Sequence, residues 1–338
     1  MMIFKRTVAL LLLLLFVFGA FACNKNETEE STTPSGTAAE TEAATEKATK
    51  KPSADETEPP KVLENTEGLD LTLKIMSQNL CAGERTGANA IEARTERFGA
   101  MIEEYAPDII GTQEADFKWI SYFKKLDKYG MVGLSREGKR TTAGEWNAIL
   151  YNKDRFVLMD EGTFWLSSSP KEASVLSGAA NKRICTWAEL FDRYTGRTLI
   201  MANTHLDFMT PEVRVEQANI LMRYLKQVLG KRFTQCMMYL TADLNSTEAE
   251  DAHTVIYDRA FVDVRDLAKE DASEGKGTYH SFGNSEKGKE IDFCFHRGND
   301  EVLSYRIIDK KYAAGNDTEA GFVSDHYAIL VTFGMAKE

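Results

Sequence analysis

Six short apolar runs in this chain each carry a carboxylate, an Asn or a His at one end. The last is Ser324-Asp325-His326, which leads directly into the apolar stretch 328–331. Because strand interiors seldom carry Asp or Asn, one such residue would mean little. Six in order predict strand ends that meet at one polar site. The six segments are Ser77–Asn79, Gly111–Glu114, Asn203–His205, Asp243–Asn245, Ile291–Phe293 and Ser324–His326.

The apolar pattern between these segments predicts many strands and few helices. The apolar stripe of Ile91–Tyr105 predicts a helix. Thr210 followed by Pro211 predicts the start of a second long helix, with Thr as the N-cap and Pro at the first helical position. Ile184–Asp192 and Thr198–Asn203 are typical of a hairpin. This pattern does not fit a regular βαβ repeat, and it favours two β-sheets flanked by a few helices.

The polar residues of the six segments are mainly oxygen donors, joined by few imidazoles. Such hard ligands suit Mg²⁺ or Mn²⁺, whereas zinc favours more His or Cys. Mg²⁺ usually takes only one or two carboxylates and completes its shell with water and substrate phosphate. The composition of the predicted site therefore indicates phosphoester chemistry rather than metal storage.

In this order the six segments resemble the endonuclease/exonuclease/phosphatase superfamily, which includes deoxyribonucleases, abasic-site endonucleases, inositol polyphosphate 5-phosphatases, bacterial neutral sphingomyelinases and deadenylases. The resemblance covers residues 70–338 and looks closest to bacterial metal-dependent hydrolases of unassigned substrate. It implies an α/β fold, a four-layer sandwich of two mixed β-sheets flanked by helices. Four further segments look like that bacterial subgroup: Gly144–Ile149, Gly162–Leu166, Arg183–Trp187 and Gly277–Phe282.

The resemblance also implies which residues hold a metal ion. Glu114 is expected to be the principal ligand, with Asn79 beside it. Asp325 is expected close to the metal or to a histidine. Mg²⁺, or Mn²⁺ in its place, is the implied cofactor.

Catalytic roles follow from the same resemblance. Asp243 is expected to orient or deprotonate the attacking water, and Asn245 to donate a hydrogen bond to a phosphate oxygen. His326 is expected to pair with Asp292. A carboxylate behind a histidine favours its protonated form, so the pKa of His326 should rise above its ordinary value.

Further residues complete the predicted site. His205 is expected to be a second imidazole on the phosphate side, and Glu145 its carboxylate partner. Arg183 is a candidate clamp for a phosphate, with a structural ion pair as the alternative. His280 lies in a Gly- and Ser-rich loop and is a candidate for substrate contact.

The N-terminal residues predict export and a lipid tether. Residues 1–23 combine Lys5-Arg6, a short apolar core and small residues, as in a signal peptide. Cys23 after Ala20-Phe21-Ala22 looks like the lipidated cysteine of a bacterial lipobox, with a conventional cut near Ala22 as the alternative. Residues 24–69 are expected to be a disordered acidic linker, followed by the domain at 70–338. The expected location is therefore extracytoplasmic, on the cell membrane.

The cysteines beyond Cys23 match neither a disulfide framework nor a zinc motif. Cys81, Cys185, Cys236 and Cys294 are therefore expected to be four buried thiols that pack as small hydrophobic side chains, with one bridged pair as the alternative.

Charge bears on the substrate. Residues 24–70 hold 12 acidic and 5 basic residues, so most of the net charge of −11 lies there and the domain carries about −6. A nonspecific nuclease gains affinity from many Lys and Arg contacts to phosphates. We therefore expect a Mg²⁺-dependent phosphoester hydrolase, first of all a phosphodiesterase, that contacts the membrane only through its anchor and is a monomer. The alternatives are a secreted nuclease on DNA or RNA, a phosphomonoesterase of sugar or inositol phosphates, and a non-catalytic binding protein of the same fold.

Overall fold

The computed structural model describes residues 60–68, 70–138, 142–259, 261–285, 288–315 and 320–335. The predicted signal peptide, Cys23 and most of the predicted linker lie outside these residues. All described residues belong to one compact unit, 58–338. The N–H of Leu63 donates to the carbonyl of Arg193 at 2.9 Å, so the last part of the predicted linker lies against the domain. Among the helices of the described residues, none is long and apolar enough to cross a membrane.

The described chain alternates strands with few helices, as the apolar pattern predicts. The strands are β1 Leu73–Asn79, β2 Ile109–Gln113, β3 Tyr129–Val132, β4 Ile149–Asn152, β5 Phe156–Trp165, β6 Ile184–Asp192, β7 Thr198–His205, β8 Met237–Asp243, β9 Val262–Asp263, β10 Glu270–Ala272, β11 Asp292–Arg297, β12 Glu301–Ile308 and β13 Ala328–Gly334. The helices are α1 Ile91–Tyr105, α2 Phe117–Phe123, α3 Pro211–Leu229, α4 Arg232–Gln235, α5 Asp251–Tyr257 and α6 Val264–Leu267, with 3₁₀ turns η1 Gly87–Asn89 and η2 Ser281–Gly283.

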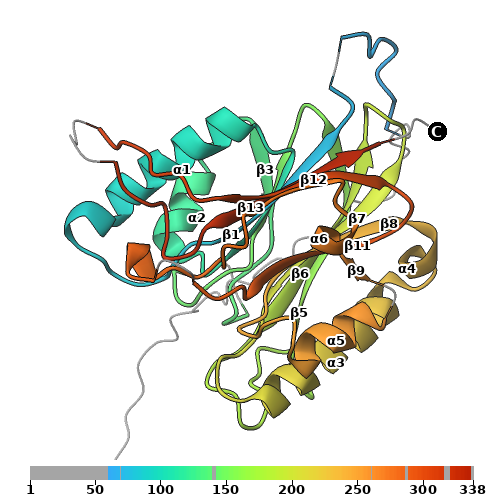
Figure 1. The fold of residues 1–338 in the computed structure, drawn as a ribbon. Helices are drawn as coiled ribbons and strands as arrows, with labels where there is room; N and C mark the ends of the chain where they lie inside the picture. Colours follow the sequence, from blue (N-terminus) through green and yellow to red (C-terminus); the bar gives the residue numbers. More distant parts are fainter. Residues whose placement is uncertain are drawn as a thin grey trace, which may run out of the picture. The chain divides into compact units, whose positions relative to one another are not determined.

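The strands form two mixed sheets that pack face to face. One has the order β10-β12-β13-β1-β2-β4-β3 and the other β5-β6-β7-β8-β11-β9. Figure 1 shows α1 and α2 outside the first sheet and α3 and α5 outside the second. The predicted four-layer sandwich is therefore confirmed.

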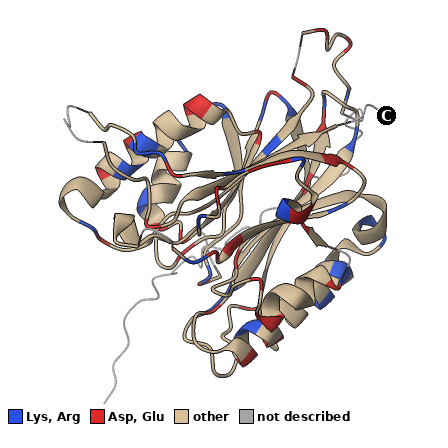
Figure 2. Cartoon of the chain, viewed as in Figure 1, with Lys and Arg blue, Asp and Glu red and all other residues tan. Residues whose placement is uncertain are grey.

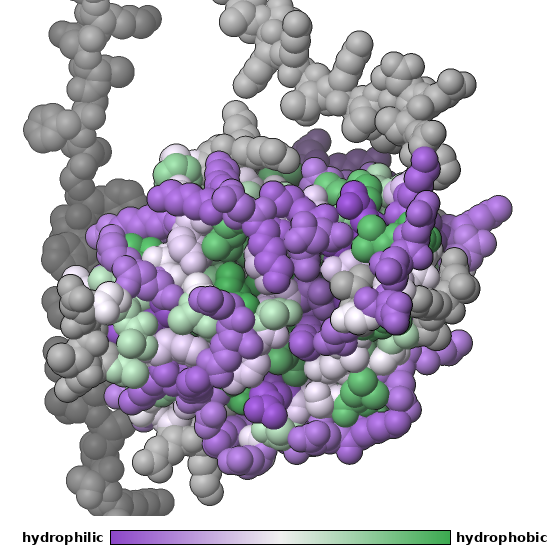
Figure 3. Space-filling view, turned by 90° about the horizontal axis from the view of Figure 1, so that it is seen from above, coloured by the Kyte–Doolittle hydropathy of each residue, from purple (hydrophilic) through white to green (hydrophobic). Residues whose placement is uncertain are grey.

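Three apolar layers hold the sandwich together. One lies between α1, α2 and the first sheet, and includes Phe98 and Trp119. The second lies between the two sheets, and the third between the second sheet and α3 and α5. On the face shown in Figure 3, apolar side chains of the described residues appear as small patches among hydrophilic ones. The apolar side chains of the three clusters are buried between the layers, as a sandwich of amphipathic elements requires.

Several predicted elements agree with the structure. α1 and β6 have the predicted bounds, and Thr210 caps α3 by accepting a hydrogen bond from the N–H of Val213 at 3.3 Å. The apolar pattern did not reveal β12, whose residues alternate less regularly in burial. The four cysteines of the described residues are free thiols. Cys236 is only half-buried, so the prediction of four buried thiols is wrong at that position, which lies just before β8 begins.

The two sheets approach each other closely beside the polar strand ends. A Cβ on Gly111 of β2 would lie 1.9 Å from the Oγ1 of Thr241 on β8, so only glycine fits there. Asn203 of β7 joins the sheets: its Oδ1 accepts from Gln113 Nε2 at 2.7 Å, and its Nδ2 donates to the Thr112 carbonyl at 2.7 Å. Gly111 and Asn203 therefore have structural roles: they bring the two sheets together at the edges that carry the site.

Candidate active site

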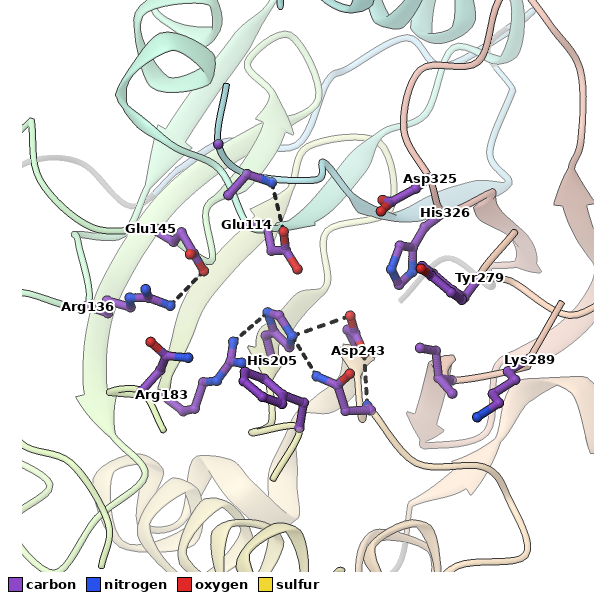
Figure 4. A pocket seen from close by; sticks show the side chains of 16 residues that line it. Glu114, Arg136, Glu145, Arg183, His205, Asp243, Tyr279, Lys289, Asp325 and His326 are labelled. Atoms are coloured by element: carbon purple, nitrogen blue, oxygen red, sulfur yellow. Dashed lines mark hydrogen bonds and ion pairs between the residues drawn. The ribbon is translucent and has the colours of Figure 1, made fainter. Parts of the chain in front are cut away.

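Five of the six polar segments line one pocket of about 590 Å³, and Asn79 of the sixth lies behind it, bonded to Glu114 and Asp243. β1 runs parallel to β2, and β7 parallel to β8, so each pair ends at the same edge of its sheet. β13 and β11 run antiparallel to these neighbours and begin at that edge. Figure 4 shows the side chains that converge there. The predicted convergence of strand ends is confirmed, and the sheet pairing is its cause.

Glu114 follows β2 and is held by the backbone of another strand end. Its φ of +55° is left-handed, which turns the chain sharply after the strand. Its Oε2 accepts from the N–H of Ala82 at 2.7 Å. The buried guanidinium of Arg94 fixes that loop by donating to the Leu80 carbonyl at 2.6 Å and the Cys81 carbonyl at 3.1 Å. α1 thus supports the position of the Glu114 carboxylate.

Asn79, the last residue of β1, connects two carboxylates. Its Nδ2 donates to Glu114 Oε1 at 3.1 Å and to Asp243 Oδ2 at 2.7 Å. Its Oδ1 accepts from the N–H of Cys81 at 2.8 Å. The amide therefore presents its nitrogen, not the oxygen that a metal ligand requires, to the carboxylates.

Asp243 ends β8 directly opposite Asp292, the first residue of β11. Both carboxylates are buried. Burial and then the charge of Asp292 raise the pKa of Asp243 to about 7, against the opposing charge of His326. Two buried carboxylates opposite each other leave an excess of negative charge that a cation would neutralise.

His326 forms the predicted pair with Asp292. Its Nδ1 lies 2.7 Å from Asp292 Oδ2. Burial works against a charged imidazole, but Asp292, then Asp243 and Asp325, outweigh burial and raise the pKa of His326 to about 10. A protonated His326 thus faces the pocket at neutral pH, as the predicted rise in pKa requires.

Asp325 lines the pocket beside His326. The backbone of His280 holds Asp325 in place. The N–H groups of His280 and Ser281 donate to the Asp325 carbonyl at 2.9 and 3.0 Å. The His280 ring is 0% exposed and stacks on Tyr327 with centroids 3.7 Å apart. Burial and then the charge of His326 lower the pKa of His280 to about 4. The predicted substrate contact of His280 is not seen, since its ring packs beneath the loop that presents Asp325.

His205 and Glu145 both line the pocket, but they have different partners from those expected. His205 Nδ1 lies 2.9 Å from Arg183 Nη1, and Glu145 Oε2 accepts from Arg136 Nη1 at 2.7 Å. The expected pairing of Glu145 with His205 is therefore wrong. Glu145 pairs with Arg136, whereas His205 lies against Arg183, so the two residues have separate partners.

Burial and the arginine beside it both disfavour a charged His205. Burial, followed by the charge of Arg183, lowers the pKa of His205 well below its ordinary value. His205 Nδ1 faces the donor Arg183 Nη1, and His205 Nε2 lies 2.9 Å from Asn245 Nδ2 and 3.4 Å from Asp243 Oδ2. The Nε of Arg183 also lies 3.4 Å from Asp207 Oδ2. Arg183 thus has the ion pair that was the alternative, and it still lines the pocket.

Asn245 closes the site beside His205, in a left-handed conformation with φ +48°. Its N–H donates to Asp243 Oδ1 at 2.9 Å, which turns the chain at the end of β8. Its Nδ2 donates to the Leu206 carbonyl at 3.0 Å and lies 2.9 Å from His205 Nε2. Its side chain lines the pocket, as the role of phosphate donor requires.

Several pocket residues were not predicted from the sequence. Most of them lie within four positions of a motif or inside one, which is the signal that could have identified them. Lys289 lies two positions before the Ile291–Phe293 segment, and Phe208 lies three positions after the Asn203–His205 segment. The unpredicted lining residues are Ala82, Gly83, Arg136, Asn181, Phe208, Tyr279, Lys289 and Ile291.

The donor set fits a hard divalent cation. Ligand atoms of Glu114, His205 and Asp243 lie within 4.8 Å of one another, as do those of Asp243, Asp292 and His326. Asp292 Oδ1 is buried and has no hydrogen-bond partner among the described residues. Carboxylate oxygens with unbalanced charge are the ligands that Mg²⁺ and Mn²⁺ prefer.

Comparison with known proteins decides the family. The model of the Endonuclease/Exonuclease/phosphatase family matches residues 76–326, most of the chain. The chain belongs to this family. Enzymes of the family are hydrolytic phosphoesterases and nucleases that generally depend on a divalent metal, and the predicted superfamily is thus confirmed. This chain is accordingly a phosphoester hydrolase.

Two solved structures of the family resemble this one over their whole length. A mannosyl-6-phosphatase of Bacteroides thetaiotaomicron is 25% identical, with a TM-score of 0.71 over 78% of this chain and 100% of its own. A family protein of Bacteroides vulgatus is 27% identical, with a TM-score of 0.68 over 79% of this chain and 100% of its own.

A curated relative, an RNA exonuclease of Saccharomyces cerevisiae, is 27% identical over 143 residues. The match spans 39% of this chain and 38% of that protein, which is less than half the length of either.

Proposed function

We propose that this protein is a Mg²⁺-dependent hydrolase of phosphate esters that works by direct attack of water on phosphorus. The observation that carries the proposal is the convergence of Glu114, Asp243 and the Asp292–His326 pair on one pocket. Glu114 would hold the cation, with Asp325 beside it. When bound there, the cation neutralises charge on the phosphate oxygens.

The side chains divide the remaining work. Asp243, whose pKa is raised to about 7, would accept a proton from the attacking water. Protonated His326 and the amide of Asn245 would stabilise the charge that develops on the non-bridging oxygens. Neutral His205 would act as a hydrogen-bonding group rather than as an acid, because burial and then the charge of Arg183 lower its pKa.

The sequence-based expectation of a phosphodiester substrate stays our first proposal, and Mn²⁺ the alternative cation. A phosphomonoester is the second candidate. It is favoured by the likeness to the mannosyl-6-phosphatase over that protein's full length. DNA and RNA are less favoured, because Lys and Arg are interspersed with Asp and Glu over the described residues in Figure 2.

Hydrolysis of bis-p-nitrophenyl phosphate and p-nitrophenyl phosphate by the full-length protein tests the proposal, with Mg²⁺, Mn²⁺ or EDTA. We expect chelator-sensitive cleavage that Asp243→Asn abolishes. The exposed Asp258, which lies outside the pocket, offers a control variant, Asp258→Asn, that should keep full activity. Cleavage that is insensitive to EDTA or retained in Asp243→Asn would contradict the proposal.

We also propose that Cys23 carries a lipid that holds the domain outside the cytoplasmic membrane. The support is the sequence alone: a basic start, a short apolar core and small residues before the cysteine. In a bacterial host, the protein should incorporate labelled palmitate and sediment with membranes, and Cys23→Ser should lose both properties. Incorporation of label into the variant would contradict the proposal.

A further inference from the structure

The pocket has one exposed aromatic side chain on its wall. Phe208 is 55% exposed and lines the pocket between His205 and α3. Its neighbour Met209 is 50% exposed but does not line the pocket. Large apolar side chains cost free energy when they stay in water. An aromatic ring left exposed beside reacting groups is therefore a candidate surface for the organic part of the substrate.

The backbone that carries Phe208 is held firmly. The buried carboxylate of Asp207 accepts from the N–H of Met209 at 3.1 Å and from the N–H of Asn181 at 3.0 Å. Arg214 donates to the Phe208 carbonyl at 3.4 Å. The ring is thus presented on a preorganised turn, which reduces the entropy lost when a ligand binds.

Polar groups stand beside the ring. The Asp207 carboxylate that positions Phe208 also positions the backbone of Asn181 and contacts Arg183. The Asn181 side chain lines the pocket and makes no hydrogen bond with the residues that the structure describes. An aromatic face next to a free amide and a guanidinium suits a ring with an apolar face and hydroxyl groups at its edge. The C–H groups of a sugar carry partial positive charge and would lie on the negative face of the phenyl ring.

The charges around the pocket disfavour a nucleic-acid strand. Arg136 is paired with Glu145 and Arg183 with Asp207. Among the lining Lys and Arg residues of the described chain, this leaves Lys289 without a carboxylate partner. A strand needs several cations along its backbone. The volume of about 590 Å³ is within the range of roughly 300–1,000 Å³ typical of small-molecule sites.

We propose that Phe208 and Asn181 form a subsite for the sugar ring of a phosphorylated sugar, with the ring face on Phe208 and a hydroxyl group bonded to Asn181. The inference rests on the proposed phosphoester hydrolysis and names its substrate class. Phe208 and Asn181 are specificity residues, and they leave the chemistry at phosphorus to the groups described above.

The test compares esters that share a phosphate but differ in the ring. Full-length protein with Mg²⁺ is given a hexose 6-phosphate, glycerol 3-phosphate and thymidine 5′-phosphate, each as the monoester and as its methyl diester. The variants are Phe208→Ala, Phe208→Trp and Asn181→Ala, with Met209→Ala as the matched control. We expect Phe208→Ala to lower kcat/KM for the hexose ester by about 3- to 10-fold, the size of an aromatic contact. The glycerol ester should be cleaved unchanged, and Phe208→Trp should retain the preference.

The outcomes separate the subsite from the activity. Equal losses on hexose and glycerol esters, or no loss in Phe208→Ala, would overturn the sugar subsite while hydrolysis itself stands. A Phe208-dependent preference for the thymidine ester would overturn it in favour of a nucleotide substrate. Failure of the unaltered protein to cleave any ester with Mg²⁺ or Mn²⁺ would instead refute the proposed function.

Discussion

The Asp292–His326 pair provides a sharp prediction, because its effect has both a size and a direction in pH. The two side chains are buried and 2.7 Å apart, with Asp292 Oδ2 next to His326 Nδ1. Asp292→Asn keeps the volume but removes the charge. Since burial lowers the pKa of His326 and Asp292 is the largest influence that raises it, the pKa should fall from about 10 towards or below its ordinary value of 6.5.

Loss of a protonated group that acts on the transition state costs about 10²- to 10⁴-fold in rate. We therefore expect Asp292→Asn to lower kcat by that factor at pH 7.5 with saturating Mg²⁺. The alkaline limit of activity should also move to lower pH. A bound cation would lower the pKa of His326 in both proteins, so the direction of the difference is unchanged.

The same pair has a linked effect on stability. A histidine whose pKa is raised on folding stabilises the protein fully below its unfolded pKa, and this stabilisation is lost as the pH rises through its folded pKa. The stability deficit of metal-free Asp292→Asn should therefore be larger at pH 6 than near pH 10. Urea unfolding at both values measures it.

Kinetics of the full-length variants at pH 6 to 10 check the prediction. Asp258→Asn is the control, and His326→Gln and the double variant complete a cycle. If the residues act as one unit, the double variant is no slower than His326→Gln alone. A loss below about tenfold, an unmoved alkaline limit, or losses that simply multiply would refute the reasoning.

Three further predictions concern other parts of the structure. Glu114→Gln should raise the Mg²⁺ concentration for half-maximal activity by at least about tenfold, the loss that even outer-shell partners of a metal cause; an unchanged Mg²⁺ titration would remove Glu114 from the cation site. Asp192→Ala leaves the guanidinium of buried Arg155, 2.8 Å from Asp192 Oδ2, without its main partner and should lower the free energy of unfolding by about 3–5 kcal/mol in urea. Asp160→Ala, at a half-exposed pair, should cost at most about 1 kcal/mol as the control. Gly111→Ala places a methyl group 1.9 Å from Thr241 Oγ1 and should cost about 1–3 kcal/mol; Thr241→Ala should recover part of this loss, and full stability of Gly111→Ala alone would contradict the close packing of the sheets.

The substrate question depends on groups that surround the reacting centre rather than on the centre itself. In the proposed mechanism, Glu114, Asp243, Asn245 and His326 would act on any phosphate ester in the same way. Phe208 and Asn181 would touch only what is attached to the phosphate. Variants of the first four residues should therefore hydrolyse every ester more slowly. Variants of Phe208 and Asn181 should instead lose the preference for one ester over another.

The sequence by itself predicted the architecture, which the structure confirms, and named the polar groups that gather at the site. Strand-end polar residues such as Asp243 and His326 stand out because strands otherwise exclude them, and their order matched a known family. The apolar period of Ile91–Tyr105 determined α1 to the residue. These signals are patterns among residues that are close in the sequence, so they can be recognised before the fold is known.

Only the tertiary structure decided the partners. Glu145 and His205 are 60 positions apart in the numbering, and nothing local shows that Arg136 and Arg183 lie between them. Burial decided that His280 supports Asp325 instead of touching substrate. Pairing, burial and charge depend on which distant segments the two sheets bring together. Apart from the Asp292–His326 pair, which the family resemblance implied, the sequence could therefore name the groups at the site but not which of them bond to each other.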